Sequence, residues 1–146
     1  MTIKQIINSL RELKGFTLKV NDDNVIEILP DDPLGFPVFL TSTDKELLIQ
    51  WGPCHQHFDD KYSSREEGLK LFYYSLSTKA RLKVFSRGSY DYNWRFEINN
   101  GPAWDLIDST YIGSMFWKKK KERTYQNNIL DNKTLGKILS QYGQCI

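Results

Sequence analysis

The sequence has few of the residues that hold metals or form cross-links, because its 146 residues include only two cysteines and two histidines. Disulfides are rare in reducing compartments, so we expect Cys54 and Cys145 to be free thiols in a cytoplasmic protein. The first ten residues, MTIKQIINSL, have neither a long apolar core nor a small-residue cleavage site, and we expect no signal peptide. No apolar run approaches the length of a membrane span, so we expect no membrane partner.

The sequence also has little net charge and no nucleotide-binding glycine motif. The formal net charge is +2, which gives no basis for a general electrostatic attraction to nucleic acid. Neither a G-x-G-x-x-G nor a Walker pattern occurs, so we predict no nucleotide cofactor and no other cofactor.

Aromatic side chains, in contrast, are abundant: the chain has eight Phe, eight Tyr and four Trp. Large flat side chains pack well on a pleated sheet, which favours a fold rich in strands. The length is that of one domain, and it suffices to bury a core without disulfides or metal. We therefore predict a single domain over residues 1–146, with Trp51, Trp94 and Phe96 in its core.

Three segments have apolar residues at helical spacing and a polar residue that can cap the first turn. The predicted helices are residues 3–14, 64–76 and 131–143. Thr2 can cap the first helix, Ser64 and Glu67 form a capping-box pattern at the second, and Asp131 or Asn132 begins the third.

The remaining patterned segments alternate apolar and polar residues, as half-buried strands do. The predicted strands are residues 16–20, 25–29, 38–40, 47–51, 81–87, 92–98, 103–111 and 122–126. Strands grouped between isolated helices indicate an α+β fold. We expect a mostly antiparallel, twisted sheet of about six to eight strands with an N-terminal, a central and a C-terminal helix.

Both histidines and one cysteine lie in the segment WGPCHQHFDD, residues 51–60. We expect it at the end of the preceding strand and in the loop that follows. In an extended chain His55, His57 and Asp59 share one face and Cys54 points to the other. This set does not have the spacing of a zinc finger, ribbon or metalloprotease helix. We predict no metal and no enzyme; a small enzyme or metal site over residues 54–59 is an alternative.

A second group of candidate residues is basic. An alternating strand pattern gathers Arg81, Lys83 and Arg87 on one face, with Arg95 on the next strand. A basic sheet face with aromatic residues can hold single-stranded nucleic acid through phosphate contacts and stacking. A solvated polar face is the other interpretation, and no ribonucleoprotein, KH or helix-turn-helix signature is present. We therefore expect weak, sequence-independent binding of nucleic acid at most.

Residues 51–126 contain five recognisable elements: WGPCHQHFDD, SREEGLKLF, RLKVFSRG, YNWRFE and MFWKKK. In these elements the chain resembles small single-domain bacterial proteins, several of which are similar to immunity proteins of contact-dependent and polymorphic toxin systems. The resemblance implies a cytoplasmic inhibitor that binds a cognate protein toxin and masks its active site. Immunity proteins share little sequence, so the resemblance assigns no residue.

The partner-binding residues are therefore inferred from chemistry alone. The candidates are His55, His57, Asp59, Asp60, Tyr62 and Tyr90. Acidic loop residues accelerate association with a basic toxin. Tyrosine offers a large rigid face with a polar tip, which suits a central anchor.

Overall fold

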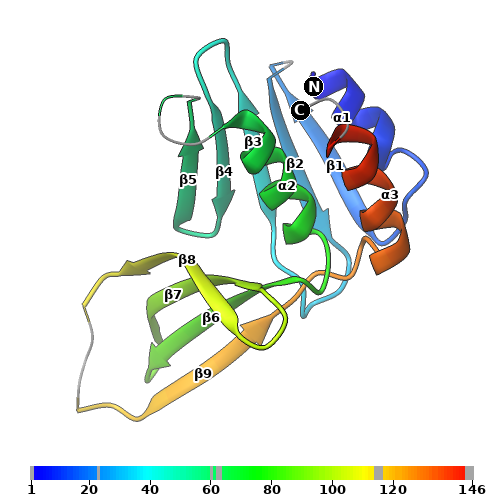
Figure 1. Cartoon of the computed structure of the whole chain (residues 1–146). Helices are drawn as coiled ribbons and strands as arrows, with labels where there is room; N and C mark the ends of the chain where they lie inside the picture. Colours follow the sequence, from blue (N-terminus) through cyan, green and yellow to red (C-terminus); the bar gives the residue numbers. More distant parts are fainter. Residues whose placement is uncertain (1, 23, 60, 62–63, 114–116, 144–146) are drawn as a thin grey trace.

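The computed structural model describes residues 2–22, 24–59, 61, 64–113 and 117–143. Within these ranges the chain forms three helices and nine strands, so the predicted α+β class is confirmed. The helices are α1 (Ile3–Leu10), α2 (Arg65–Ser75) and α3 (Asn132–Gly143). They lie at the predicted N-terminal, central and C-terminal positions (Figure 1).

The strands form two antiparallel sheets rather than one (Figure 1). Sheet A has five strands in sequence order, β1 (Phe16–Asn21), β2 (Val25–Pro30), β3 (Val38–Ser42), β4 (Leu47–Trp51) and β5 (Cys54–Phe58). Sheet B has the order β8-β7-β6-β9, and its strands are β6 (Ala80–Arg87), β7 (Tyr90–Asn99), β8 (Trp104–Tyr111) and β9 (Lys120–Tyr125).

The position predicted for the histidine segment is wrong, because residues 54–58 form strand β5 instead of a loop. Gly52 has a φ of +59°, which glycine adopts readily, and the chain reverses there so that Cys54 pairs with Trp51. Cys54 and Phe58 are buried while His55 and His57 are exposed. The polar composition of the segment hides this alternation.

Helix α1 is shorter than predicted and ends at Leu10 rather than near residue 14. Thr2 and Gln5 form the reciprocal capping box at its start. After Leu10 the chain tightens, with the Arg11 N–H bonded to the carbonyl of Asn8 and the Leu13 N–H to that of Leu10. Gly15, at φ +91°, then turns the chain into β1.

The core lies where the helices and sheet B meet sheet A. All three helices lie on the same side of sheet A (Figure 1). Along β2, β3 and β4 of this sheet, buried side chains alternate with half-buried ones. Trp51 stacks on Phe96 of β7 with ring centroids 3.7 Å apart and an interplanar angle of 5°. Both side chains are fully buried, as predicted, whereas Trp94 is only half-buried against the core.

Candidate functional site

Exposed apolar side chains gather at one end of sheet B. This end cluster consists of Tyr90, Tyr111, Ile112 and Trp117, which are 60–67% exposed. They are four of the seven large apolar side chains that are exposed in the described part of the chain. The β6–β7 turn, the end of β8 and the approach to β9 meet there, at the left end of sheet B in Figure 1.

Hydrogen bonds and ring contacts hold this end of the sheet in place. The Tyr111 ring meets Tyr92 edge-on at 5.8 Å, and the Ile112 N–H donates to the Tyr92 carbonyl at 2.9 Å. On the other side, Arg87 donates from Nη1 to the Lys118 carbonyl at 3.0 Å. Tyr111, Ile112 and Lys118 are therefore held by contacts with residues of β6 and β7, which reduces the entropy lost on binding.

Four consecutive lysines follow Trp117 and border the end cluster. This lysine rim consists of Lys118, Lys119, Lys120 and Lys121, all of which are exposed. Lys120 lies over the ring of Phe85, with its Nζ 4.7 Å from the ring centroid. Next to the rim, Arg123 of β9 pairs with Asp91 of β7.

The structure brings the predicted basic residues together on the outer face of sheet B. Lys83 lies opposite Arg95 in the β6–β7 register, and Arg81 and Arg87 occupy alternate positions on either side of Lys83. The carboxylates that pair with these cations were not predicted from the sequence. Glu97 accepts from Arg81 at 2.8 Å and lies 3.7 Å from Arg95.

The same face contains a second carboxylate and a covered aromatic ring. Lys83 Nζ is 2.9 Å from Glu122, and Lys83 lowers the pKa of this carboxyl through a hydrogen bond. The guanidinium of Arg81 lies 4.0 Å from the ring centroid of Trp104. Because Glu97 and Glu122 come from β7 and β9, only the strand register reveals that they lie among the basic residues.

His55 and His57 lie side by side on the exposed face of β5, with ring centroids 5.3 Å apart. His57 Nδ1 is 2.9 Å from Glu46, and the His55 backbone N–H donates to Asp108 at 2.8 Å. Cys54 points into the core, as the alternation predicts. Among the residues that the structure describes, no three metal-ligating side chains form a group.

The Cys54 thiol is buried between the sheets. Its Sγ lies 3.7 Å from the carbonyl oxygen of Trp94, and Thr110 donates to it at 3.8 Å. Burial raises the pKa of this thiol, and the charge of Asp108 acts in the same direction. The arrangement disfavours a thiolate, and the sheet separates Cys54 from both histidines.

The other predicted partner-binding residues divide between two surfaces. Asp59 follows β5 in sheet A, where its carboxylate accepts from the Lys61 N–H at 3.0 Å. Tyr90 belongs to the end cluster of sheet B. Asp60 and Tyr62 lie outside the described residues.

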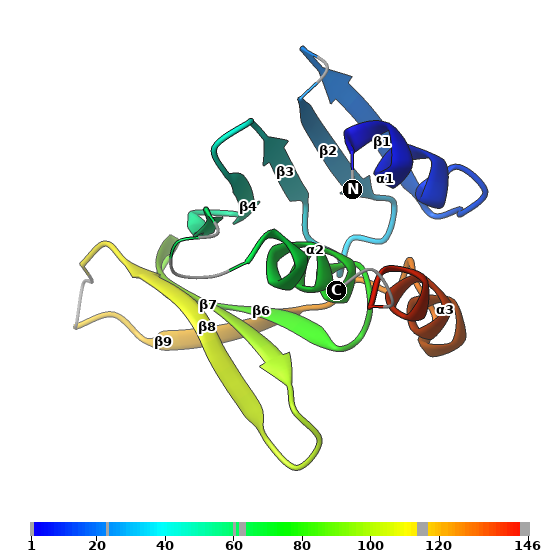
Figure 2. The same cartoon turned by 45° about the horizontal axis from the view of Figure 1, so that its top comes forward.

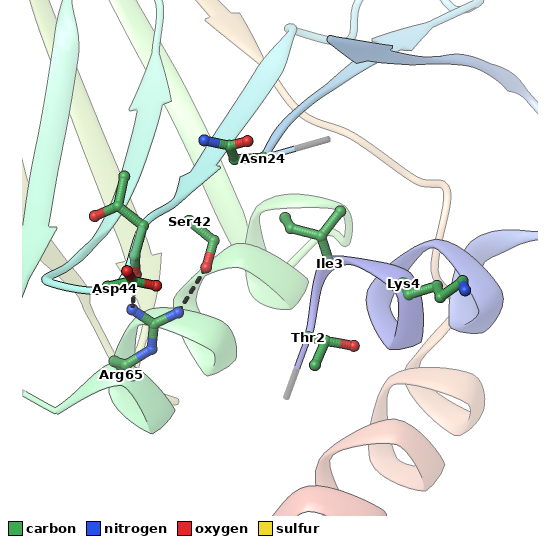
Figure 3. Close-up of a pocket in the computed structure, with 8 residues that line it drawn as sticks. Thr2, Ile3, Lys4, Asn24, Ser42, Asp44 and Arg65 are labelled. Carbon is green, nitrogen blue, oxygen red and sulfur yellow. Dashed lines mark hydrogen bonds between the residues drawn. The ribbon is translucent and has the colours of Figure 1, made fainter. Parts of the chain in front are cut away.

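An open polar hollow lies beside the start of α1 and was not anticipated from the sequence. Its volume is about 750 Å³, and Figure 3 shows Arg65 of α2 reaching across to β3. Arg65 donates to the Ser42 hydroxyl at 2.6 Å and to the Thr43 carbonyl at 2.9 Å. The guanidinium thereby ties α2 to the β3–β4 connection, which is a structural role.

Comparisons with protein families, with curated proteins and with solved structures find no match to this chain. Within the described ranges, no helix has both the length and the apolar character that crossing a bilayer requires.

Proposed function

We propose that this chain is a cytoplasmic binding protein that neutralises a cognate protein toxin by covering its active site. The observation that carries the proposal is the end cluster on sheet B. Exposed apolar groups gathered at one end of a sheet are characteristic of interaction sites, and Tyr and Trp are among the residues most enriched at the centre of binding interfaces.

The end cluster has the composition of a docking site with a centre and a rim. Tyr90, Tyr111, Ile112 and Trp117 provide apolar area, and the lysine rim borders it with charge. Protein interfaces have this anatomy, with aromatic anchors inside and polar groups at the margin. A stable toxin complex would bury about 1,200–2,000 Å² in total, so the contact would extend from the end cluster over neighbouring parts of sheet B.

The outer face of sheet B is less suited to single-stranded nucleic acid than its basic residues suggest. Glu97 and Glu122 lie among the cations, and each would repel a phosphate. The ring of Trp104 is covered by Arg81 and that of Phe85 by Lys120, so a stacking base would first have to displace a cation. We therefore favour a protein partner over nucleic acid.

Co-production with the protein encoded by the adjacent gene tests the proposal. The chain should restore growth of cells that make the toxin, and the two proteins should co-purify. The double variant Tyr90→Ser/Trp117→Ser should raise the dissociation constant about 30-fold or more, because two interface anchors worth at least about 1 kcal/mol each contribute about 2 kcal/mol or more together.

The matched control is Val20→Ser/Leu34→Ser, which removes two exposed apolar side chains from sheet A and a loop. It should bind and protect like the original chain. If the original chain neither binds nor protects, the proposed function is wrong. If it protects and the end-cluster variant protects equally well, the toxin docks elsewhere.

A further inference from the structure

We infer that the surface that docks on the end cluster is an acidic protein surface, whose carboxylates meet the lysine rim. This inference rests on the proposed function, since it assigns the chemistry of the partner at the same site. It also separates two sets of basic residues that the sequence does not distinguish. One set is paired with carboxylates within sheet B, and the other is available to a partner.

The paired set lies on the outer face of sheet B. Arg81 and Arg95 share the carboxylate of Glu97, which is largely buried, and Lys83 pairs with Glu122. Breaking these contacts would leave Glu97 desolvated without its partners, which is costly. Arg81 and Arg95 therefore remain with Glu97 when a partner binds.

The available set lies in the lysine rim. Within the described part of the chain, Lys118, Lys119 and Lys121 form no ion pair. The charges that surround the end cluster are six cations and two carboxylates, a net of +4, although the whole chain carries only +2. They are Arg87, Lys118, Lys119, Lys120, Lys121 and Arg123, with Asp91 and Glu122. The rest of the chain is therefore net negative by two charges.

The pattern of charge at this end favours a protein over a uniform polyanion. Asp91 and Glu122 are partly exposed among the cations, and both would repel a phosphate backbone or an anionic bilayer. A folded partner can place its own donors opposite these two carboxylates and its acidic groups opposite the lysines. Electrostatic matching of this kind mainly raises the association rate and fixes orientation.

The test is a charge reversal of the rim, Lys118→Glu/Lys119→Glu/Lys121→Glu. The control reversal, Lys14→Glu/Lys133→Glu/Lys137→Glu, changes the net charge equally at exposed positions before β1 and on α3. Association with the adjacent-gene protein is measured at several salt concentrations, after circular dichroism has shown that both variants are folded. The rim reversal should slow association at least about 10-fold at low salt, and the control about twofold or less.

Three defined probes test the chemistry without the toxin. They are a 20-residue peptide of Glu and Asp with interspersed Leu, a 20-nucleotide oligothymidine, and vesicles of phosphatidylserine and phosphatidylcholine. The acidic peptide should bind most tightly at physiological salt, and the rim reversal should abolish this binding while the control reversal retains it. Tighter binding of oligothymidine or vesicles, lost in the rim reversal, would overturn the inference.

The outcomes for the two proposals are distinct. If the toxin binds and the rim reversal leaves the association rate unchanged, the proposed function stands and the acidic-partner inference fails. If the acidic peptide binds through the rim but the adjacent-gene protein does not, the chemistry of the surface stands and the toxin assignment fails.

Discussion

Asn127 shows how one buried side chain joins three segments of the fold. Its Oδ1 accepts from the Phe36 N–H at 2.9 Å, and its Nδ2 donates to the carbonyls of Phe36 and Ser75, each at 2.9 Å. The loop before β3, the end of α2 and the chain after β9 are thereby held together. Gly35 is required beside it, because a Cβ there would lie 2.7 Å from Asn127 Oδ1.

Replacement of Asn127 by Ala should lower the free energy of unfolding by at least about 2 kcal/mol. Each buried backbone group left without a partner costs about 1–3 kcal/mol. Urea denaturation measures the change. The neighbouring exposed residue provides the control, since Asn128→Ala should stay within about 0.5 kcal/mol of the original chain. Equal effects of the two substitutions would show that the Asn127 contacts contribute little.

The Cys54 thiol should react slowly with a thiol reagent in the folded protein. Burial raises its pKa, so the reactive thiolate is depleted at neutral and mildly alkaline pH. The measurement uses the Cys145→Ser variant, in which Cys54 is the one remaining thiol. Reaction with an aromatic disulfide at pH 8 should be slow in buffer and fast in urea. Fast reaction without denaturant would place the thiol at an accessible, polar position.

At the scale of secondary structure, the helices begin where polar side chains cap them. Ser64 accepts from the Glu67 N–H at the start of α2, as the capping pattern predicts. Asp131 rather than Asn132 caps α3, accepting from the Thr134 N–H at 2.6 Å. Such caps satisfy backbone donors that the helix itself leaves unpaired.

The cap at α3 should depend on pH. The hydrogen bond from Thr134 lowers the pKa of Asp131, so the carboxylate is favoured in the folded state. Its contribution to stability is fully present at neutral pH and is lost as the pH falls through the lowered pKa. Nuclear magnetic resonance titration should give a pKa for Asp131 below the ordinary aspartate value.

Two substitutions test the same cap by thermal unfolding at neutral pH. Asp131→Ala should lower the Tm, and Asp131→Asn, which retains an oxygen acceptor, should lower it less. Asn132→Ala is the control, because this residue does not supply the cap, and its Tm should remain near that of the original chain. A larger decrease in Tm for Asn132→Ala than for Asp131→Ala would mean that Asn132, and not Asp131, caps the helix.

At the scale of the whole molecule, Trp51 joins the two sheets and α2. It stacks on Phe96 of sheet B, and its Nε1 donates to Ser75 of α2 at 2.7 Å. Figure 2 shows sheet A and sheet B as separate layers with α2 close to both. The packing of one layer on the other therefore depends on this side chain.

Trp51→Ala should reduce the free energy of unfolding by about 3–5 kcal/mol, the usual cost of removing a large buried aromatic side chain. Trp117→Ala is the matched control, since Trp117 is 67% exposed and its loss should change stability by about 0.5 kcal/mol or less. Because Trp117 belongs to the end cluster, the proposed function predicts that Trp117→Ala weakens binding of the partner. Chemical denaturation showing equal losses would mean that Trp51 does not join the layers.

Local patterns predicted most of the secondary structure because the information they need lies within a few residues. Alternation in 81–87 and 92–98 and the caps at Thr2 and Ser64 are examples. The same patterns did not predict β5, since its polar surface residues resemble a loop. Its buried ends, Cys54 and Phe58, become informative only when β4 lies beside them.

The sequence by itself determined the α+β class, the order of the elements other than β5, and the shared face of Arg81, Lys83 and Arg87. Only the tertiary structure decided that the strands divide into two sheets, that Glu97 and Glu122 pair with cations of that face, and that the end cluster forms. The physical reason is the range of the interactions. Periodicity and capping act between residues two to four apart, whereas strand register, ion pairs and surface clusters join residues far apart in the chain.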